Sequence, residues 1–235
     1  MPFDVESGPG WVIYNGDALD VLPALPQQFG ALVTDPPYAT AGGNTNGRTS
    51  GADVQFWQHW WKDVWRETTA KLTEDGSGFV FCDWRMIAAL ADASIDGRDT
   101  QRAKSWRISQ GLVWDRESIG MGAPFRSGYE MIGFARGPKW KHDPVVIPRN
   151  IPAVIRHRWT YGRHVHHGAE KPVDLLRRLI AWTSGPVLDP FVGSGSTVVA
   201  ALQEGRTVVG IERDSKTFAS AVRRVRTATA QWALP

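Results

Sequence analysis

Two short motifs, each at the end of an apolar run, constrain the fold of this chain more than any other feature. An Asp-Pro-Pro-Tyr motif (residues 35–38) follows the run 31–34, and a glycine-rich turn, Asp-Pro-Phe-Val-Gly-Ser-Gly-Ser-Thr (residues 189–197), follows the run 186–189. Short apolar runs that end in turn residues are typical of buried strands. Since ligands of open α/β sheets bind outside the carboxyl ends of strands, the two motifs predict two parts of one site.

The remaining pattern alternates between strands and helices. Apolar, β-branched runs predict strands at 11–14, 31–34, 78–82, 111–114, 130–135, 186–189 and 207–211. Helical periodicity predicts helices at 55–71, 84–91, 173–183, 196–204 and 215–229. This alternation is typical of an α/β fold with a mostly parallel sheet, here of seven strands, covered by helices on both faces. A chain of 235 residues is long enough for one such domain with long insertions.

Two stretches without periodicity are expected to be functional loops. Residues 39–54 are rich in Gly, Asn, Thr and Ser, and residues 137–168 are rich in Pro, His and Arg. From Arg136 to His167 there are seven Lys or Arg residues and one acid, Asp143, so this stretch carries +6 whereas the whole chain carries +3. Phosphate contacts require such a local basic surface. The alternative is a solvated basic loop without a partner.

The glycine-rich turn has the features of a nucleoside-binding turn. Gly193 and Gly195 permit positive φ and a close approach of the backbone to a ligand, and Ser196 or Thr197 is expected to cap the following helix. Glu212 lies 19 residues after Gly193 at the end of the next predicted strand, where an acid typically accepts hydrogen bonds from ribose hydroxyls. No Gly-Lys-Ser/Thr follows, and the third glycine of a dinucleotide-binding turn is missing. A plain tight turn with a surface glutamate is the alternative.

The Asp-Pro-Pro-Tyr motif suits the recognition of a flat base that carries an amino group. Pro36 and Pro37 fix φ and hold the backbone rigid, so that carbonyls unused by any strand can face a cleft. Asp35 can accept one hydrogen of an exocyclic amine and the Pro36 carbonyl the other, which aims the nitrogen lone pair at a methyl donor. The two acceptors also stabilise the positive charge that grows on that nitrogen. Tyr38 offers a surface for base stacking; a proline turn in which Tyr38 caps the core is the alternative.

Four of the twelve tryptophans fall at helical spacing, namely Trp57, Trp60, Trp61 and Trp65. They share one face of the predicted helix 55–71, and core packing is their expected role because aromatic side chains bury large areas. Cys82 is the only cysteine, which excludes an internal disulfide and suits a reducing cytoplasm. No apolar segment of a secretory signal is visible, and no apolar run approaches the length of about 18 residues that a membrane span needs.

These motifs resemble those of the amino-methyltransferases that use S-adenosylmethionine (SAM) to methylate adenine N6 or cytosine N4 in DNA. The resemblance covers roughly residues 11–226 and implies a Rossmann-like fold of SAM-dependent methyltransferases. Because the target-base motif precedes the SAM motif, the sheet is expected to be circularly permuted, in the order typical of the beta group of this family. A single domain, 1–235, is then expected, with residues 39–60 and 137–168 as insertions that recognise the target and bind DNA.

The resemblance also implies roles for individual residues. Asp35, Pro36, Pro37 and Tyr38 are expected to be catalytic. The residues implied to contact the cofactor are Asp17, His167, Lys171, Pro172, Asp189, Phe191, Gly193, Gly195, Ser196, Thr197 and Glu212. Within that set, the segment with His167, Lys171 and Pro172 is implied to line the methionine end, and Asp17 to contact the adenine. The residues expected to bind DNA are Arg48, Arg149, Arg156, Arg158, Arg163 and His164. The segment 114–130 looks like the family's final strand pair and is expected to shape the target pocket.

The function that the resemblance implies is transfer of a methyl group from SAM to N6 of adenine in double-stranded DNA, after the base is flipped out of the stack. Adenine enzymes more often begin the motif with Asp, and cytosine enzymes with Ser. Methylation of cytosine N4, of RNA or of a free nucleoside is the alternative. Enzymes that methylate a protein glutamine usually carry Asn-Pro-Pro-Tyr and place the SAM motif first. A nucleic-acid binder with an inactive SAM fold is the alternative from a different class.

The resemblance further implies a cytoplasmic enzyme, prokaryotic or phage-encoded, that acts without a nuclease in its own chain. Members of the beta group often form homodimers, so a homodimer is one expected state. No membrane partner and no metal are expected. His157, His164, His166 and His167 are clustered, but there is no Cys nearby and their spacing fits no zinc finger.

Overall fold

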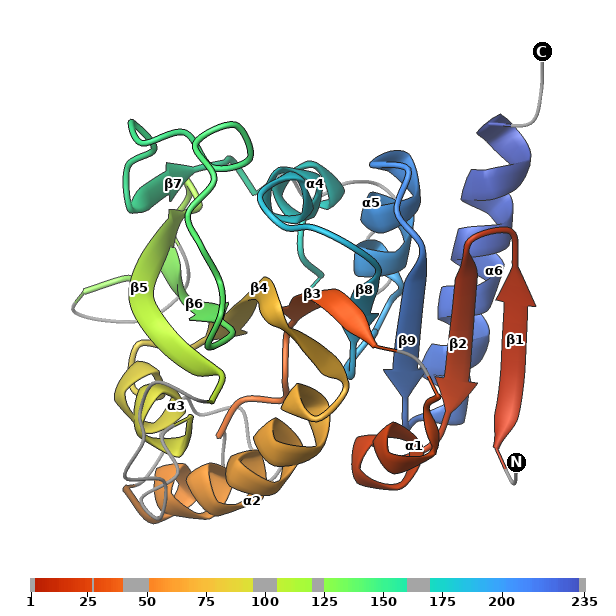
Figure 1. The fold of residues 1–235 in the computed structure, drawn as a ribbon, viewed down its shortest axis with the longest axis horizontal. Coiled ribbons are helices and arrows are strands. Elements are labelled where there is room, and N and C mark those ends of the chain that lie inside the picture. The colour runs from red at the N-terminus through yellow and green to blue at the C-terminus, as the bar shows by residue number, and fades with distance from the viewer. Residues whose placement is uncertain are drawn as a thin grey trace.

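The computed structural model describes residues 3–26, 28–39, 51–94, 105–119, 125–159 and 170–232, with the backbone alone for 51–53. Its centre is one sheet of nine strands in the order β1-β2-β9-β8-β3-β4-β6-β5-β7 (Figure 1). The bounds are β1 Asp4–Gly8, β2 Trp11–Asn15, β3 Phe29–Thr34, β4 Leu72–Cys82, β5 Arg107–Asp115, β6 Tyr129–Arg136, β7 Val154–Arg156, β8 Val187–Asp189 and β9 Val208–Glu212. β1 and β6 run antiparallel to their neighbours, and the other strands all point the same way.

The observed sheet corrects the predicted count of seven strands. All seven predicted strands are present, and the two additional ones, β1 and β7, form its edges. β1 is polar and largely exposed, and β7 has only three residues. β1 contains no apolar run, and the two apolar residues of β7 follow a proline and are too few to show a strand period, so periodicity could not predict either. β3 and β8 are neighbours in the sheet although β3 comes far earlier in the chain, which agrees with the predicted permuted order.

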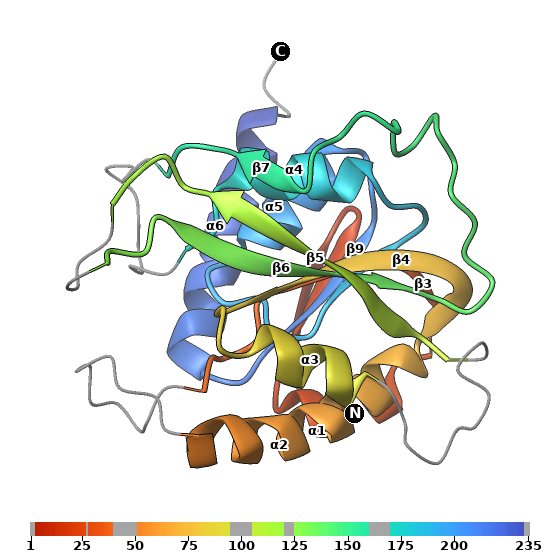
Figure 2. The same cartoon turned by 90° about the vertical axis from the view of Figure 1, so that its left-hand side faces the viewer.

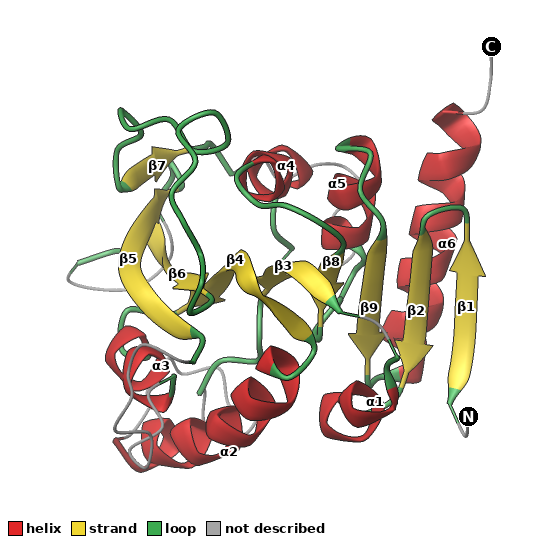
Figure 3. Ribbon diagram, in the orientation of Figure 1, coloured by secondary structure: helices red, strands yellow, loops and turns green. Residues whose placement is uncertain are grey.

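Helices cover both faces of the sheet, as predicted. α1 (Ala18–Ala24), α2 (Gly51–Thr69) and α3 (Ile87–Ala93) lie on one face, and α4 (Val173–Ala181), α5 (Ser196–Gln203) and α6 (Ser215–Trp232) on the other (Figures 2 and 3). The five predicted helices are all present. α1 was not predicted, because its seven residues, with Pro23 among them, are too few to show a helical period.

The predicted tryptophan face of α2 is confirmed as part of the core. Trp57, Trp61 and Trp65 are buried, and the rings of Trp57 and Trp61 are stacked with centroids 5.4 Å apart. The Trp60 ring lies 5.5 Å from that of Phe191, so α2 also packs against the glycine-rich turn. Because α2 begins at Gly51, the last four residues of the predicted loop 39–54 are helix, and the predicted helix 55–71 begins earlier than expected.

The predicted insertion 137–168 is anchored to the core where it is described. Ile147, Ile151 and Trp159 pack against the core cluster on the α4 face of the sheet. β7 then extends the sheet beside β5. Residues 160–169 lie outside the described part of the chain. Among the described helices, none is both long and apolar enough to cross a membrane.

Candidate active site

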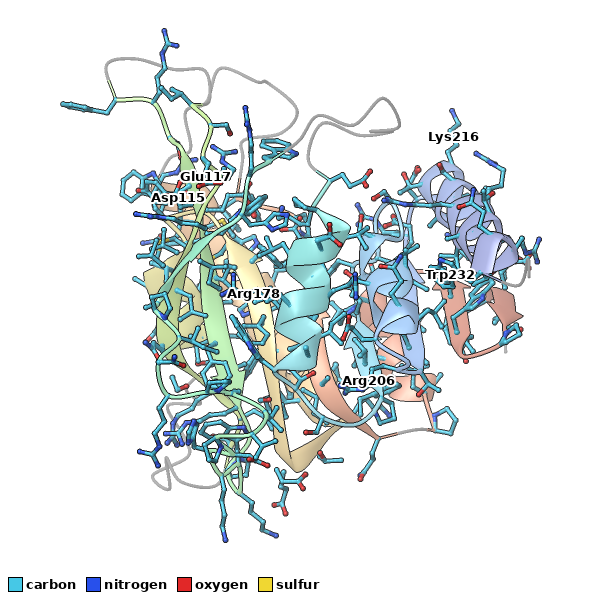
Figure 4. The ribbon with its side chains drawn as sticks, turned by 90° about the horizontal axis from the view of Figure 1, so that it is seen from above. Asp115, Glu117, Arg178, Arg206, Lys216 and Trp232 are labelled. Atoms are coloured by element: carbon cyan, nitrogen blue, oxygen red, sulfur yellow. The ribbon has the colours of Figure 1, made fainter. Side chains whose placement is uncertain are left out.

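The strands that carry the two motifs end at the same edge of the sheet. β8 pairs in parallel with both β3 and β9, so the Asp-Pro-Pro-Tyr motif, the glycine-rich turn and Glu212 all lie at the carboxyl edge. Seen from above, Asp115 at the end of β5 and Lys216 after β9 lie toward this edge, and Arg206 before β9 lies toward the opposite one (Figure 4). The sequence motifs therefore meet in space, as predicted.

A buried hydrogen bond joins the two motifs directly. The hydroxyl of Thr34, the last residue of β3, donates to Oδ1 of Asp189 at 2.8 Å, and the backbone N–H of Phe191 donates to the same oxygen at 3.0 Å. Burial raises the pKa of Asp189 to about 6, although the hydrogen bonds from Thr34 and Phe191 lower it. Asp189 was predicted to bind a cofactor. It lines a cavity, and it also fixes the start of the glycine-rich turn to β3.

The glycine-rich turn has the backbone conformation that its glycines allow. Gly193 has φ +53° and Gly195 has φ +85°, both in the left-handed region that side chains disfavour. A Cβ on Gly195 would lie 3.3 Å from the Cβ of Ala221 on α6, so a side chain there would also crowd α6. The backbone N–H of Gly193 donates to Oε2 of Glu212 at 3.0 Å.

The predicted cap of α5 is wrong. α5 begins at Ser196, and its N-cap is Gly195, without a side-chain hydrogen bond. The Ser196 hydroxyl instead lies 3.0 Å from that of Ser194, and Arg224 on α6 donates to both hydroxyls at 3.1 Å. The Ser196 hydroxyl thus binds the guanidinium of Arg224 instead of capping α5, and a local sequence pattern cannot predict a contact between such distant residues.

Two cavities adjoin at this edge. The smaller, about 180 Å³, is lined by residues of the glycine-rich turn and by Asp35, Glu170, Lys171, Leu176 and Thr217. The larger, about 590 Å³, is lined by Gly16, Asp17, Ala18, Asp35, Pro37, Tyr38, Phe56, Trp57, Trp60, Pro190, Phe191, Gly193, Ile211, Glu212 and Arg213. Asp35, Phe191 and Gly193 line both. An elongated ligand can therefore extend along the glycine-rich turn past Asp35.

Most of the predicted cofactor residues are placed at these cavities. Asp17 caps α1 by accepting from the N–H of Leu19 at 3.0 Å, and its carboxylate also lies 3.5 Å from Arg213. The carboxylate of Glu212 accepts from Gly193 and, at 2.8 Å, from the N–H of Asp214. Pro172 is the N-cap residue of α4. His167 lies outside the described residues.

A compact cluster of charged groups surrounds Asp35. Nζ of Lys171 lies 2.6 Å from Oδ2 of Asp35 and 3.2 Å from Oε2 of Glu130. The hydroxyl of Tyr38 donates to the same Glu130 oxygen at 3.0 Å. The Lys171 side chain is only 7% exposed, and its ammonium lies near the rings of Tyr38 and Phe81. Lys171 was predicted to contact a cofactor; it lines the smaller cavity and also binds the first residue of the Asp-Pro-Pro-Tyr motif.

The charges in this cluster shift one another's pKa values. Burial raises the pKa of Asp35, the Lys171 ammonium opposes that effect, and the Glu130 carboxylate adds to it. Burial lowers the pKa of Lys171, but Asp35 and Glu130 outweigh it and raise that pKa overall. Burial and the two carboxylates also raise the pKa of Tyr38 well above its ordinary value. Lys171 is therefore cationic and Tyr38 neutral at physiological pH.

The backbone of the Asp-Pro-Pro-Tyr motif is held from the α2 side. Nε1 of Trp57 donates to the Pro37 carbonyl at 2.7 Å, and the N–H of Ala39 donates to Sδ of Met86 at 3.3 Å. Pro36 is buried beside them. The motif is thus fixed by a side chain of α2 as well as by its own prolines.

The structure brings only some of the predicted DNA-binding residues together. Arg156 at the end of β7 is 77% exposed and lies 3.8 Å from Asp115. Arg158 is also exposed, and the backbone beside it bonds to Asp115 and Arg116 at the carboxyl edge. Arg149 is not placed with them: it lines a separate cavity of about 450 Å³ with Trp140 and Trp182. Arg48, Arg163 and His164 lie outside the described residues.

Only His157 of the histidine cluster is described, and its backbone carbonyl accepts from Nε1 of Trp114 at 2.7 Å. The described part of the chain contains no group of three or more His, Cys, Asp or Glu side chains that could hold a metal ion.

Three site residues were not singled out from the sequence. Glu130 lies near the start of β6 and was expected only as part of a pocket-shaping segment. Glu170 and Arg224 form an ion pair of 2.5 Å beside the smaller cavity. None of the three belongs to a recognisable motif, and charged residues are common on protein surfaces. Their proximity to the motifs arises from the sheet order, which local patterns do not encode.

Comparisons with known proteins agree with this geometry. A family model described as DNA methylase (N6_N4_Mtase) matches residues 30–223. YubD of Escherichia coli (strain K12) is 30% identical over 209 residues, which cover 84% of this chain and 82% of YubD. The DNA adenine methyltransferase YhdJ of the same strain is 26% identical over 253 residues, which cover 92% of this chain and 83% of YhdJ.

Solved structures share the fold. The PvuII DNA methyltransferase (cytosine-N4-specific) matches with a TM-score of 0.69 at 16% identity, covering 94% of this chain and 92% of that one. M1.HpyAVI, solved as a complex with SAM, matches with a TM-score of 0.64 at 21% identity, covering 90% of this chain and 98% of that one. These likenesses confirm the predicted methyltransferase-like α/β fold.

Proposed function

The chain belongs to the DNA methylase family of N6 and N4 amino-methyltransferases, and on this premise we propose that it transfers a methyl group from SAM to N6 of adenine in double-stranded DNA. The observation that carries the proposal is the position of Asp35. Its carboxylate lies where the two cavities adjoin, next to Tyr38, and its Oδ1 is buried without a hydrogen-bond partner among the described residues. A carboxylate with spare acceptor capacity suits an exocyclic amine.

The residues along the glycine-rich turn fit SAM. The larger cavity suits the adenosine part, with Glu212 toward the ribose hydroxyls and Asp17 toward the adenine. The smaller cavity suits the methionine part. Oε2 of Glu170 is buried without a hydrogen-bond partner among the described residues, and Glu170 lines that cavity, so an ammonium group would satisfy it. Gly193 lines both cavities, and because it has no side chain, the ligand can lie close to the backbone there.

The Asp-Pro-Pro-Tyr motif positions the target amine for direct transfer. Asp35 and the Pro36 carbonyl accept the two amine hydrogens, which turns the nitrogen lone pair toward the methyl carbon. SAM supplies the methyl group on a sulfonium sulfur that leaves as a neutral thioether. The nitrogen–carbon bond forms as the carbon–sulfur bond breaks, and Asp35 stabilises the positive charge that develops on the nitrogen. The extra proton then leaves the methylated amine, with the Asp35 carboxylate as the nearest acceptor before water.

Exposed arginines support DNA, rather than a free nucleoside, as the substrate. Arg156 and Arg158 lie at the carboxyl edge, beside the strand ends that form the site, and suit phosphate contacts next to a flipped base. We also propose that residues 39–60 and 137–168 select the target sequence.

The proposed assembly is a homodimer. Size-exclusion chromatography with light scattering tests the dimer.

Adenine is the proposed base because the motif begins with Asp35. The alternative, cytosine N4, is favoured by the fold likeness to a cytosine-N4-specific enzyme. The test is mass spectrometry of nucleosides from unmethylated DNA treated with the enzyme and SAM. N6-methyladenine is the expected product. N4-methylcytosine without N6-methyladenine would overturn the choice of base but leave the amino-methyltransferase chemistry intact.

A further inference from the structure

Lys171 and Glu130 form a buried ion pair that touches both ends of the Asp-Pro-Pro-Tyr motif. Lys171 binds the Asp35 carboxylate at 2.6 Å, and Glu130 accepts from both Lys171 and the Tyr38 hydroxyl through one oxygen. The two residues come from distant parts of the chain, one just before α4 and one near the start of β6. The contacts are short, and the side chains are 7% and 17% exposed, so the pair is not a surface ion pair of little energetic weight.

The cluster is balanced in charge. Glu130 also lies 3.6 Å from Nη1 of Arg116, whose guanidinium in turn packs over the Trp159 ring and donates to the Ser127 carbonyl. Two carboxylates and two cations thus face one another at the carboxyl edge. Buried charges persist in proteins only when they are paired. Removing one member leaves another uncompensated, so the cluster as a unit defines the electrostatic state of Asp35.

From this geometry we infer that Lys171 and Glu130 are positioning residues for methyl transfer. Lys171 holds the Asp35 carboxylate ionised and oriented, and Glu130 holds Lys171 together with the Tyr38 ring. The inference rests on the proposed function, since it gives Asp35 the role of acceptor for the target amine. Neither residue needs to touch the target base: each acts through the motif residue that it binds.

The direction of the effect on Asp35 follows from its neighbours. Burial and the Glu130 carboxylate raise the pKa of Asp35, and the Lys171 ammonium lowers it. A protonated Asp35 loses acceptor capacity, so activity is present above this pKa and is lost as the pH falls through it. The charged and titratable groups that face Asp35 from the elements around it are Lys171, Glu130, Tyr38, Cys82 on β4 and Asp189 on β8, with Arg116 behind Glu130.

The two single variants therefore have opposite signs. In Lys171→Met, burial and Glu130 raise the Asp35 pKa against the hydrogen bond with Tyr38 alone, and the acid limb of the pH–rate profile moves to higher pH. In Glu130→Gln, one of the groups that raise the Asp35 pKa is removed, while the amide oxygen can still accept from Tyr38, so the acid limb moves to lower pH. Lys171→Arg keeps the charge and is expected to keep the wild-type limb. In the double variant Lys171→Met, Glu130→Gln, the acid limb lies at a lower pH than in Lys171→Met alone.

The experiment is single-turnover methyl transfer into DNA between pH 5 and pH 9, which separates chemistry from product release. A shift of about one pH unit for Lys171→Met corresponds to about a tenfold lower rate on the acid limb. Calorimetric titration with SAM checks that each variant is folded and binds cofactor. A wild-type enzyme that methylates no DNA would defeat the proposed function itself.

Two outcomes with an active wild-type enzyme would overturn the positioning role. One is a lower rate for Lys171→Met at every pH with an unchanged acid limb. The other is weaker SAM binding as the main effect of Lys171→Met, with an unchanged acid limb, which would favour the cofactor contact for Lys171 that the family resemblance implies. The supporting result is an acid limb that moves to higher pH in Lys171→Met and to lower pH in Glu130→Gln. A mere loss of packing would not shift the two limbs in opposite directions.

Discussion

The Thr34 hydroxyl donates a buried hydrogen bond of 2.8 Å to Asp189, although 155 residues separate the two in the chain. Thr34 directly precedes the Asp-Pro-Pro-Tyr motif, and Asp189 opens the glycine-rich turn. Together with the pairing of β3 and β8, this side-chain contact fixes the distance between the part of the site that suits the base and the part that suits the methyl donor. Direct transfer requires such a fixed distance, because the reacting atoms must meet within about 3–3.5 Å.

Thr34→Val should destabilise the protein. The substitution keeps the shape of the side chain but leaves the buried Asp189 carboxylate with one partner fewer, at an expected cost of about 1–3 kcal/mol in the free energy of unfolding. Urea denaturation measures it. Thr34→Ser is the matched control, because it keeps the hydroxyl and should fall closer to the wild type. Equal stability of Thr34→Val and the wild type would show that the bond carries no net free energy.

Asp189 should make stability depend on pH in a defined window. Its folded pKa of about 6 lies above its ordinary 3.8, so the folded state holds a proton that the unfolded state has already released. Wild-type stability should therefore fall, relative to Asp189→Asn, as the pH rises from 3.8 to about 6, and the difference should stay constant above that. The expected change is on the order of 3 kcal/mol. Parallel stability profiles for the two proteins between pH 4 and pH 7 would contradict the assignment.

Asp35→Ala and Gly193→Val should separate chemistry from cofactor binding. Asp35→Ala is expected to lose turnover but keep SAM binding. Gly193→Val should lose both, because a β-branched residue is strained at φ +53° and its side chain would extend beside both cavities.

Gly205→Val is the control for backbone strain alone. Gly205 has φ +67° in the turn after α5, and a Cβ there meets nothing within 4 Å. That variant should lose stability yet bind SAM by calorimetry.

If Asp35→Ala abolished SAM binding as completely as Gly193→Val, the division of the site into two parts would be wrong.

Removal of positive charge at the carboxyl edge should weaken DNA binding and flatten its salt dependence. Neutralising Arg156 and Arg158 at this edge, together with Arg163 of the same basic stretch of sequence, is expected to reduce the slope of log K against log salt by about 0.9 for each phosphate that the protein no longer neutralises. Arg149→Gln removes the same kind of charge from an exposed position on a different cavity and should change the slope less. Fluorescence anisotropy with a short duplex measures both. An unchanged slope in the triple variant would rule out this surface as the DNA-binding one.

The sequence predicted the type and position of most helices and strands, but not the two edge strands. It also predicted the two motifs of the site, but not the side-chain contacts that join them to the rest of the chain. β3 and β8 were predictable because their apolar runs end in turn residues, and Gly193 and Gly195 because positive φ has a residue-type signature. β1 lacks such a run, and β7 is too short to show one. The capping role expected of Ser196 failed because Arg224, distant in sequence, takes its hydroxyl. Likewise, the family resemblance implied a cofactor contact for Lys171, but its pairing with Asp35 and Glu130 depends on strand order, which no local pattern encodes.

The most direct test of the account is methyl transfer from labelled SAM into unmethylated genomic DNA, with total RNA and the Asp35→Ala variant measured in parallel. The account predicts label in DNA with the wild-type enzyme and none with Asp35→Ala, although that variant still binds SAM. Label in RNA alone would contradict the substrate, and label in DNA that persists in Asp35→Ala would contradict the role of Asp35.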